Sequence, residues 1–266
     1  MPNGILIIDK PADWTSMDVC AKVRGILRER RVGHGGTLDP MAEGVLPVLF
    51  GKGTKLAELL SEHDKEYRVR CRLGVTTNTQ DMTGNVLEEI SFKHITEKQL
   101  EEAVFSFLGE SFQIPPMYSA LKVDGKKLYE FAREGKTIKR EPRKILISSI
   151  EILQMNLEEG TFMIEVTCSK GTYIRTLCHD IGQKLGVGAT MESLVRIRVG
   201  EFFAKDALTL DKVEVFAKEE PETLLENMYA IDALFADFPK MQIKEAFQEK
   251  LYNGNILEGE YLIPFI

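Results

Sequence analysis

The chain is poor in cysteine, and its four cysteines show no metal-binding or disulfide pattern. Cys20, Cys71, Cys168 and Cys178 are scattered through 266 residues with no Cys-x-x-Cys pair. This usage argues against zinc and disulfides and is typical of a reducing compartment. No apolar run approaches the roughly 20 residues that a membrane helix needs. The apolar run 5–8 is too short for a signal peptide. We therefore expect a cytoplasmic protein with no membrane contact.

The sequence also lacks the motifs that hold common cofactors and metals. No Gly-x-Gly-x-x-Gly segment follows a predicted strand, so nothing supports a nicotinamide or flavin cofactor. The histidines show no metal-binding spacing. The segment 51–54 resembles a phosphate-binding loop, but Gly53 stands where that motif needs serine or threonine. Cys178, His179 and Asp180 are consecutive, so on a helix they point in different directions and cannot form a triad. We expect no metal and no cofactor.

The net charge of −7 seems to argue against a nucleic-acid partner, but the charges are unevenly distributed. Residues 211–266 hold 5 lysines and arginines against 12 acidic residues, which leaves residues 1–210 balanced with 29 of each. Basic residues cluster at 22–31 and at 121–150. A charged run is most often a solvated face, yet two such clusters beside a separate acidic tail favour a polyanion-binding surface.

Five basic residues are therefore candidates for contact with RNA. One of them precedes Pro11 near the start of the chain, and the others belong to the second basic cluster. They are Lys10, Lys122, Lys126, Lys127 and Arg143.

Alternation and capping signals predict a mixture of strands and helices. Strands are expected at 4–9, 67–73, 145–153, 161–169 and 194–203, with a buried apolar element at 45–50. Helices are expected at 15–28, 54–60, 96–108, 127–133 and 172–185. Because these elements show no regular βαβ order, they favour an α+β fold with a mixed, largely antiparallel central sheet and flanking helices. We expect residues 1–210 to form one domain and the acidic residues 211–266 a second segment.

Two of the predicted strands have basic residues on one face. In 67–73, Tyr67 and the apolar residues alternate with three arginines, which predicts one buried and one cationic face. In 194–203, Arg196 and Arg198 alternate with apolar residues in the same way. Both strands are expected to present a basic face.

Asp39 is the only carboxylate in the glycine-rich stretch 33–42. Gly33, Gly35 and Gly36 allow close approach of a ligand, and Pro40 disfavours helical geometry at Asp39. A carboxylate beside a buried apolar element is costly and suggests a functional site. On residue type alone, a turn aspartate that bonds its own backbone is the more common case.

Three further residues offer a possible site around Asp39. Arg175 and Tyr173 lie two apart at a predicted strand-to-helix junction, where free N–H groups favour anions. Arg175 alone could be a surface ion pair, or it could hold a buried carboxylate bidentately. Tyr67 could be a core aromatic, or it could stack on a nucleobase.

Several segments together resemble the TruB-type tRNA pseudouridine synthases. The resemblance runs in order through roughly residues 1–205, and its motifs are the segments 10–11, 15–16, 33–47, 65–69, 114–122, 125–129, 168–176 and 194–196. It implies the pseudouridine synthase fold and isomerisation of a uridine in the TΨC loop of tRNA, at position 55. The implied partner is the T arm of tRNA, with no metal, no cofactor and no obligate protein partner. A monomer is the expected state.

The resemblance also implies roles for six residues. Asp39 would be the catalytic aspartate and Arg175 its partner. Tyr67 would be a third catalytic residue, which stacks on the face of the target base. The remaining residues would contact the substrate: His34 the RNA near the target, and Tyr173 and Leu194 the uracil pocket.

Elementary chemistry is compatible with these roles. Uridine must lose its N1–C1′ bond, turn in place and re-attach through C5, with no redox change, so one carboxylate in a dry pocket suffices. Burial would raise the pKa of Asp39, and Arg175 would oppose that rise. Three routes stay open: attack of Asp39 on C1′, attack on C6, or abstraction of a sugar proton.

Two departures from the family pattern stand out. Asp13 replaces a glycine that is usual in the family's Lys-Pro-x-Gly-x-Thr-Ser element, at a small expected cost. Residues 228–266 resemble only the opening portion of a PUA-type RNA-binding domain, so we expect a short PUA-like remnant.

An RNA-binding or tRNA-folding protein in which catalysis is secondary is the alternative function. A two-carboxylate glycosidase lacks a clear partner acid, because Glu43 lies in the same segment as Asp39.

Overall fold

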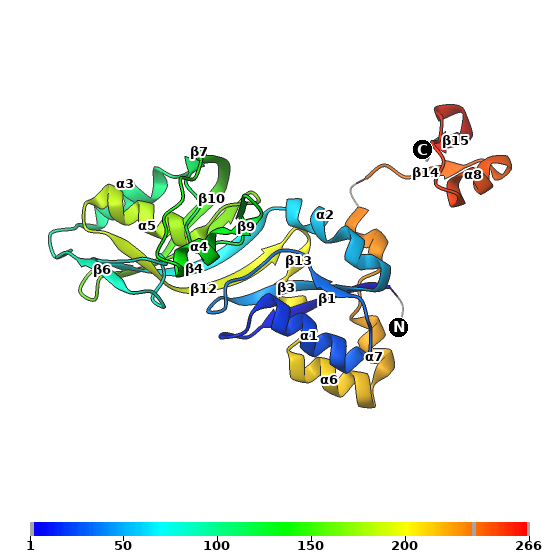
Figure 1. The fold of residues 1–266 in the computed structure, drawn as a ribbon, viewed down its shortest axis with the longest axis horizontal. Helices are drawn as coiled ribbons and strands as arrows, with labels where there is room; N and C mark the ends of the chain where they lie inside the picture. Colours follow the sequence, from blue (N-terminus) through cyan, green and yellow to red (C-terminus); the bar gives the residue numbers. More distant parts are fainter. Residues whose placement is uncertain (1–2, 236–237, 265–266) are drawn as a thin grey trace. The chain divides into compact units, whose positions relative to one another are not determined.

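The computed structural model describes residues 3–235 and 238–264. The chain forms two compact units, residues 1–229 and residues 230–266, and each is described by itself. Figure 1 traces the chain through both units. The expected boundary at residue 210 is wrong, because the helices that follow it pack within the first unit. Glu214, in the first of those helices, forms an ion pair with Lys22, with 2.6 Å between Lys22 Nζ and Glu214 Oε2.

The first unit is built on one mixed sheet. Its main strands, in spatial order, are β1 (Gly4–Lys10), β3 (Glu43–Phe50), β12 (Ala189–Val199), β4 (Lys65–Leu73), β11 (Thr161–Cys168), β10 (Arg143–Asn156) and β7 (Gly109–Gln113). Two short strands extend it: β2 (Val32–His34) pairs with β3, and β13 (Phe202–Phe203) pairs with β12. Only the β3–β12 pair is parallel among the described strands of this sheet. The predicted α+β class with a largely antiparallel sheet is confirmed.

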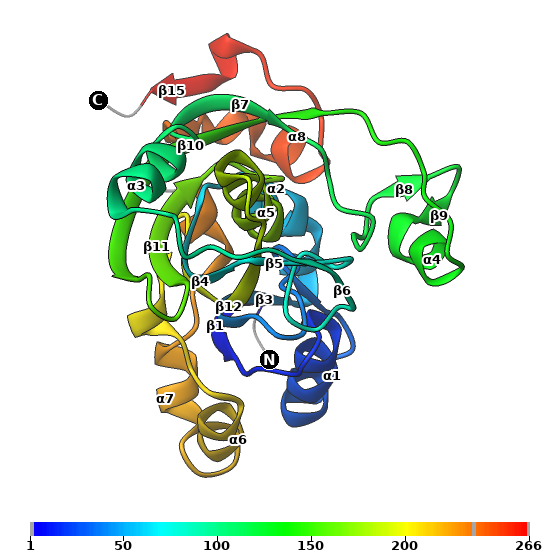
Figure 2. The same ribbon diagram turned by 90° about the vertical axis from the view of Figure 1, so that its left-hand side faces the viewer.

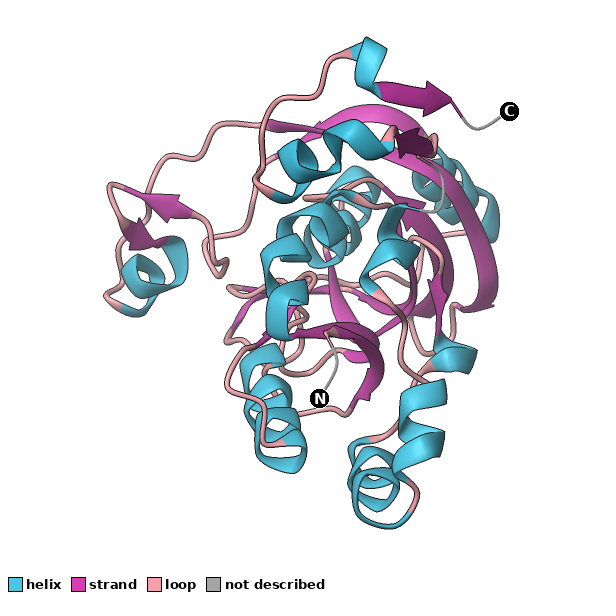
Figure 3. Ribbon diagram, turned by 90° about the vertical axis from the view of Figure 1, so that its right-hand side faces the viewer, coloured by secondary structure: helices cyan, strands magenta, loops and turns pink. Residues whose placement is uncertain are grey.

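Helices cover the sheet at two places. α5 (Ile174–Leu185) packs on β12 and β4, and α3 (Glu97–Phe105) packs on α5 and β10. Figures 2 and 3 show how the strands curve around these helices. α1 (Ser16–Leu27) and α6 (Leu210–Glu219) pack on each other, and α7 (Pro221–Glu226) packs on α6. The smaller elements are η1 (Gly51–Leu56), α2 (Ala57–Glu62), β5 (Val75–Thr77), β6 (Val86–Glu89), β8 (Lys122–Val123), β9 (Lys126–Lys127), α4 (Leu128–Arg133) and η2 (Ala204–Asp206).

Local sequence explains where the helices begin. Thr15 caps α1 by accepting from the Asp18 N–H, and the Asp18 side chain accepts from the Thr15 N–H in return. Thr96 and Gln99 form the same reciprocal pair at the start of α3. Such capping boxes satisfy N–H groups that the first helical turn leaves free. Both predicted helix starts are confirmed.

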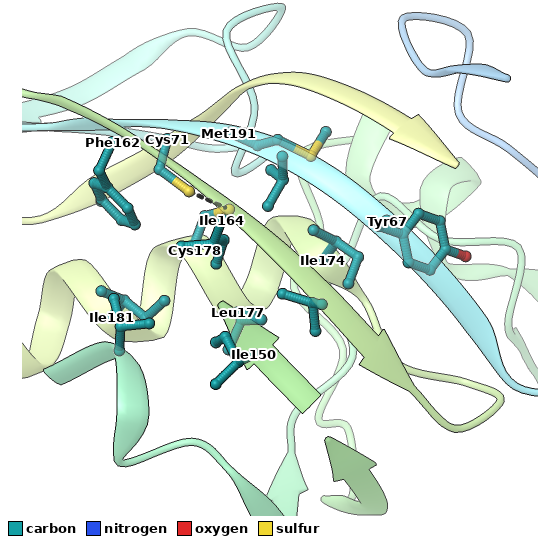
Figure 4. Close-up of a cluster of buried hydrophobic side chains, with 14 of the residues drawn as sticks. Tyr67, Cys71, Ile150, Phe162, Ile164, Ile174, Leu177, Cys178, Ile181 and Met191 are labelled. Carbon is teal, nitrogen blue, oxygen red and sulfur yellow. Dashed lines mark hydrogen bonds between the residues drawn. The ribbon is translucent and has the colours of Figure 1, made fainter. Parts of the chain in front are cut away.

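The main core lies between α5 and the central strands. Tyr67, Cys71, Phe162 and Cys178 are among its buried residues, and the two cysteine sulfurs lie 3.0 Å apart as free thiols (Figure 4). This core contains the predicted buried face of β4, because Tyr67 and the three apolar residues that alternate with it are all buried. A second core joins β1 and β3 to α1 and α6.

The arginine face of β4 exists, but glutamates cover much of its charge. Arg68 pairs with Glu165 at 2.8 Å, and Arg70 pairs with Glu192 at 2.7 Å. Arg72 also contacts Glu192. The prediction of a strongly cationic face therefore overestimated the free charge, because acidic residues of β11 and β12 lie across from the arginines.

The predicted basic face of 194–203 is wrong. β12 begins earlier, at Ala189, and ends at Val199. Arg196 lies opposite Tyr67 and Arg198 lies opposite Glu66, with a break in register between them. Tyr67 and Glu66 are neighbours on opposite faces of β4, so this irregularity turns Arg196 inward and leaves Arg198 on the outer face. Arg196 is only 1% exposed.

The second unit is small. Its elements are η3 (Ile231–Phe235), β14 (Met241–Ile243), η4 (Glu245–Phe247), α8 (Gln248–Tyr252), η5 (Gly259–Tyr261) and β15 (Leu262–Pro264). β14 pairs with β15, and Phe247 stacks on Tyr261 at a centroid distance of 4.2 Å. The PUA-like character of this segment stays a prediction. No helix within the described residues is long and apolar enough to cross a membrane.

Candidate active site

Five of the predicted site residues meet at one pocket of about 470 Å³. This volume is in the range of small-ligand sites. Three of the residues lie on regular elements: Tyr67 on β4, Leu194 on β12 and Arg175 in the first turn of α5. Tyr173 immediately precedes α5, and Asp39 comes from the loop between β2 and β3. The central strands and one helix N-terminus therefore hold the pocket.

Asp39 and Arg175 form a bidentate ion pair at this pocket. Arg175 Nε lies 2.8 Å from Asp39 Oδ2, and Arg175 Nη2 donates to Asp39 Oδ1 at 3.3 Å. The Arg175 side chain is 5% exposed and that of Asp39 is 35% exposed. Parallel contacts of this kind fix the orientation of a carboxylate as well as its charge. The predicted pairing of Asp39 with Arg175 agrees with this geometry, and its role in catalysis stays a proposal.

Arg175 is held by three further oxygen atoms. Its Nη1 donates to the Thr79 carbonyl at 2.8 Å, and its Nη2 donates to the Tyr118 carbonyl at 2.9 Å. Asp81 Oδ2 lies 3.6 Å from Nη1. The other Asp81 oxygen accepts from Thr83 N at 3.0 Å and from the Thr79 hydroxyl at 2.7 Å. Asp81 is buried and was missed at the sequence level, because it lies in a polar segment with no motif.

Burial raises the pKa of Asp39 above its ordinary value, and the charge of Asp81 adds to the rise. The charge of Arg175 and its hydrogen bond oppose this effect but do not cancel it. Asp39 and Asp81 thus share the guanidinium of Arg175, and Asp39, the less buried of the two, lies at the pocket. A carboxylate with a raised pKa is a stronger base and nucleophile once it is ionised.

Two buried side chains fix the loop that carries Asp39. Leu38 N donates to the Ser16 hydroxyl at 2.9 Å, and this hydroxyl donates to the Leu38 carbonyl at 3.2 Å. Lys10 Nζ donates to the Pro40 carbonyl at 3.0 Å and also to the carbonyls of Pro11 and Trp14. Both residues that flank Asp39 are thereby anchored to the N-terminal part of the chain.

Lys10 was a candidate RNA contact, and the structure contradicts this. Its side chain is fully buried, and three backbone carbonyls surround its ammonium group. Burial lowers its pKa to about 8. A phosphate cannot reach an ammonium group in this position, so Lys10 orders the Asp39 loop instead.

Gly44 allows β3 to approach β12 closely beside this loop. Its φ is +95°, and a Cβ atom at this position would lie 2.3 Å from the Arg196 carbonyl. The two strands pair in parallel here, with Gly44 opposite Arg196. A larger residue would therefore force apart β3, which follows the Asp39 loop, and β12, which carries Leu194.

The N-terminus of α5 is fixed through Tyr173. Its N–H donates to the Gln113 side-chain oxygen at 2.8 Å, and the Gln113 amide donates to the Tyr173 carbonyl at 3.1 Å. Burial raises the pKa of the Tyr173 hydroxyl and, separately, that of the Tyr67 hydroxyl. Both phenols therefore stay protonated at neutral pH and present polar groups to the pocket.

Comparison with known proteins fits this geometry. Residues 24–174 match the model of the TruB family pseudouridylate synthase N-terminal domain, and residues 175–235 match that of the tRNA pseudouridylate synthase B C-terminal domain. The chain belongs to the TruB family of pseudouridylate synthases. It is 44% identical over 95% of its length to tRNA pseudouridine synthase B of Clostridium perfringens (strain SM101), covering 83% of that protein. It is also 43% identical over 97% of its length to the Clostridium kluyveri protein of the same name, covering 86% of it.

Solved structures show the same relationship. The chain resembles a protein in the crystal structure of a Cbf5-Nop10-Gar1 complex, with a TM-score of 0.74 and 30% identity. This match covers 96% of the chain and 68% of the other protein. A second match, from an archaeal box H/ACA sRNP Nop10-Cbf5 complex, has a TM-score of 0.74 and 27% identity, over 98% of this chain and 70% of the other. The predicted pseudouridine synthase fold is therefore confirmed.

His34 does not line the pocket of this TruB-family enzyme. It lies on β2 opposite Val48, and its Nδ1 is buried with no hydrogen-bond partner among the described residues. Burial and the charge of Arg196 lower its pKa. A contact between His34 and RNA next to the target nucleotide stays a prediction.

The other candidate RNA contacts lie apart from the pocket wall. Lys122, Lys126 and Lys127 belong to the β8–β9 hairpin, which projects from the sheet together with α4 (Figures 2 and 3). Lys126 forms an ion pair with Glu134, whereas Lys122 is exposed. Arg143 is the exposed first residue of β10. Surface cations on a projecting hairpin are accessible to a phosphate backbone, and their contact with RNA stays a prediction.

Proposed function

We propose that this TruB-family enzyme isomerises a uridine to pseudouridine in the TΨC loop of tRNA, at position 55, with Asp39 as the acting carboxylate. The observation that carries the proposal is the Asp39–Arg175 pair at a pocket that Tyr67, Tyr173 and Leu194 also line. The names of the relatives, tRNA pseudouridine synthase B, support tRNA as the substrate.

The pocket suits a base that has left its stack. Tyr67 offers an aromatic ring and Leu194 an apolar surface, so a flipped uracil would regain contact there. Stacking of a base on an aromatic ring contributes about 1–3 kcal/mol in single-strand binders. This gain offsets much of the few kcal/mol that unstacking costs. A loop nucleotide, which is less firmly stacked than one in a duplex, is the natural substrate for such a site.

Asp39 must be ionised for each of the open routes. As a nucleophile it would donate an electron pair to C1′ or to C6, and as a base it would take a proton from the sugar. Arg175 favours the ionised form and binds both oxygens of the carboxylate, which fixes its orientation at the pocket. The arrangement supplies the positioning and charge that a reaction without redox change requires.

The decisive test is Asp39→Asn, assayed by tritium release from a tRNA transcript with uridine labelled at C5. Release follows from bond formation at C5, so we expect it to be abolished while tRNA still binds. Asp9→Asn is the matched control, because Asp9 is an exposed carboxylate on β1. Normal turnover by Asp39→Asn would show that another group acts. No release from the wild-type protein would refute the function itself.

We further propose that the chain acts alone on the T arm, as a monomer. The purified protein should then modify an isolated T-arm hairpin at a rate close to that for whole tRNA. A strict requirement for an added protein fraction would contradict this part of the proposal.

A further inference from the structure

Two buried cations line the pocket in addition to Arg175. Arg196 on β12 is 1% exposed and Lys65 on β4 is 7% exposed, and both contribute to the pocket wall. Among the residues that the structure describes, neither has a carboxylate within 4.0 Å. By contrast, Arg175 has two.

Within the described part of the chain, the hydrogen-bond partners of these two cations are neutral oxygens. Arg196 Nε donates to the Val45 carbonyl at 2.7 Å and Nη2 donates to the Gly36 carbonyl at 3.2 Å. Lys65 Nζ donates to the Ser61 carbonyl at 2.6 Å and to the carbonyl of His63. Dipoles therefore solvate the positive charges with no carboxylate in direct contact, although the charges of Asp64 and Glu62 act on Lys65 from beyond 4.0 Å.

Such an arrangement is costly without a negative partner. Burying a charge loses hydration that neutral dipoles replace only in part. Burial, reinforced by the charge of Arg196, lowers the pKa of Lys65 to about 8. The free pocket therefore has excess positive charge on this wall, and an anion in the pocket would relieve it.

Attack on C1′ or abstraction of a sugar proton detaches the uracil ring, and on these routes the reaction creates an anion at this place. When the N1–C1′ bond breaks heterolytically, the electron pair stays on N1 and the uracil ring becomes an anion. When C5 bonds to C1′, an electron pair of the ring anion enters the new bond and the ring becomes neutral. C5 then loses its proton, and N1 gains one. The bound uridine base is neutral before the bond breaks, so a cationic wall stabilises the reacting state more than the ground state.

We propose that Arg196 and Lys65 stabilise the negative charge of the detached uracil ring. This inference rests on the proposed function and assigns two residues that the Asp39–Arg175 pair does not include. A backbone phosphate is the competing anion. It is disfavoured because phosphates stay at the RNA surface, whereas both cations are almost fully buried.

The test compares two tRNA transcripts, one with uridine and one with 5-fluorouridine at the target position. Fluorine withdraws electrons from the ring, so the detached fluorouracil anion needs less help from the protein. In single-turnover reactions at saturating enzyme, Arg196→Gln should lose about 100-fold in the rate of uridine consumption, as for removal of one oxyanion donor. The loss should be several-fold smaller for 5-fluorouridine, and the dissociation constant for tRNA should stay unchanged.

Arg198→Gln is the matched control, because Arg198 lies two residues further along β12 and pairs with Glu66 on the outer face. It should keep the wild-type rate with both substrates. If Arg196→Gln does not fold, Lys65→Met carries the same expectation, with thermal unfolding of each variant as the check.

Three outcomes would overturn the proposal. Equal losses for the two substrates would indicate a structural role. Weaker tRNA binding with an unchanged saturating rate would indicate a phosphate site. Wild-type rates in both Arg196→Gln and Lys65→Met would indicate no role at all. Each of these presupposes an active wild-type enzyme, whereas an inactive wild type would refute the proposed function.

Discussion

Replacement of Arg175 by lysine tests whether guanidinium geometry, and not charge alone, holds the site together. Arg175 makes contacts in three directions: to Asp39, to the Thr79 carbonyl and to the Tyr118 carbonyl. These partners come from three separate segments of the chain. A lysine ammonium keeps the charge but is a single point with a shorter reach, so it cannot occupy all three positions.

The expected loss of stability follows from this contact set. If lysine keeps the contact with Asp39, the carbonyls of Thr79 and Tyr118 lose their partner at a site where Arg175 is 5% exposed. Each unsatisfied buried group costs about 1–3 kcal/mol. We therefore expect Arg175→Lys to lower the free energy of unfolding by about 2–6 kcal/mol. The misplaced carboxylate should reduce the single-turnover rate by about 100-fold.

Urea unfolding and single-turnover pseudouridine formation measure the two effects. The control is Arg68→Lys, because Arg68 pairs with Glu165 on an exposed face where such a pair contributes only about 0–1 kcal/mol. Arg68→Lys should leave both quantities near the wild-type values. If Arg175→Lys also kept wild-type stability and rate, charge alone would suffice and the argument from geometry would be refuted.

Three further predictions concern the residues around this pair. Because burial raises the pKa of Asp39, the single-turnover rate should fall with acid at a pH above 3.8, and a limb at that value would contradict the raised pKa. Asp81→Asn removes a charge that adds to this rise, so its acid limb should lie at lower pH than that of the wild type, which the same pH profile measures. Lys10→Met leaves three carbonyls without their donor and should cost about 3–9 kcal/mol in urea unfolding, and an unchanged midpoint would refute the anchoring role.

The elements that local sequence specifies were predicted well. The alternation in β4 correctly gave its buried face, since a period of two is a property of the strand itself. The capping signals at Thr15 and Thr96 correctly predicted two helix starts. In both cases the signal lies within a few residues, so no knowledge of the tertiary fold was needed.

Features that depend on distant segments were not predictable in this way. The arginines of β4 are paired because Glu165 and Glu192 lie on neighbouring strands, about a hundred residues away in sequence. Lys10 is buried because Pro40 and Trp14 fold over it. The charge of a residue predicts exposure only when no other part of the chain packs around it. Around Lys10, other segments do pack.

The site shows the same division. Asp39, Tyr67 and Arg175 could be identified as candidates because they stand in recognisable motifs, and the fold does bring them to one pocket. Asp81 could not, because it reaches Arg175 from a polar segment without any motif. Nothing local distinguishes it from other turn aspartates, whose carboxylates bond nearby backbone groups just as this one bonds Thr83.

Arg196 is the case in which one irregularity decides the outcome. Without a bulge, Arg196 and Arg198 would lie on the same face of β12, and both would be inside or both outside. The register break places Arg196 opposite Tyr67 and Arg198 opposite Glu66, so the first faces the pocket and the second finds a carboxylate. A strand can thus deliver one cation to the pocket without burying a second. The same irregularity makes Arg198→Gln a suitable control for Arg196→Gln, since the two side chains share a strand but not an environment.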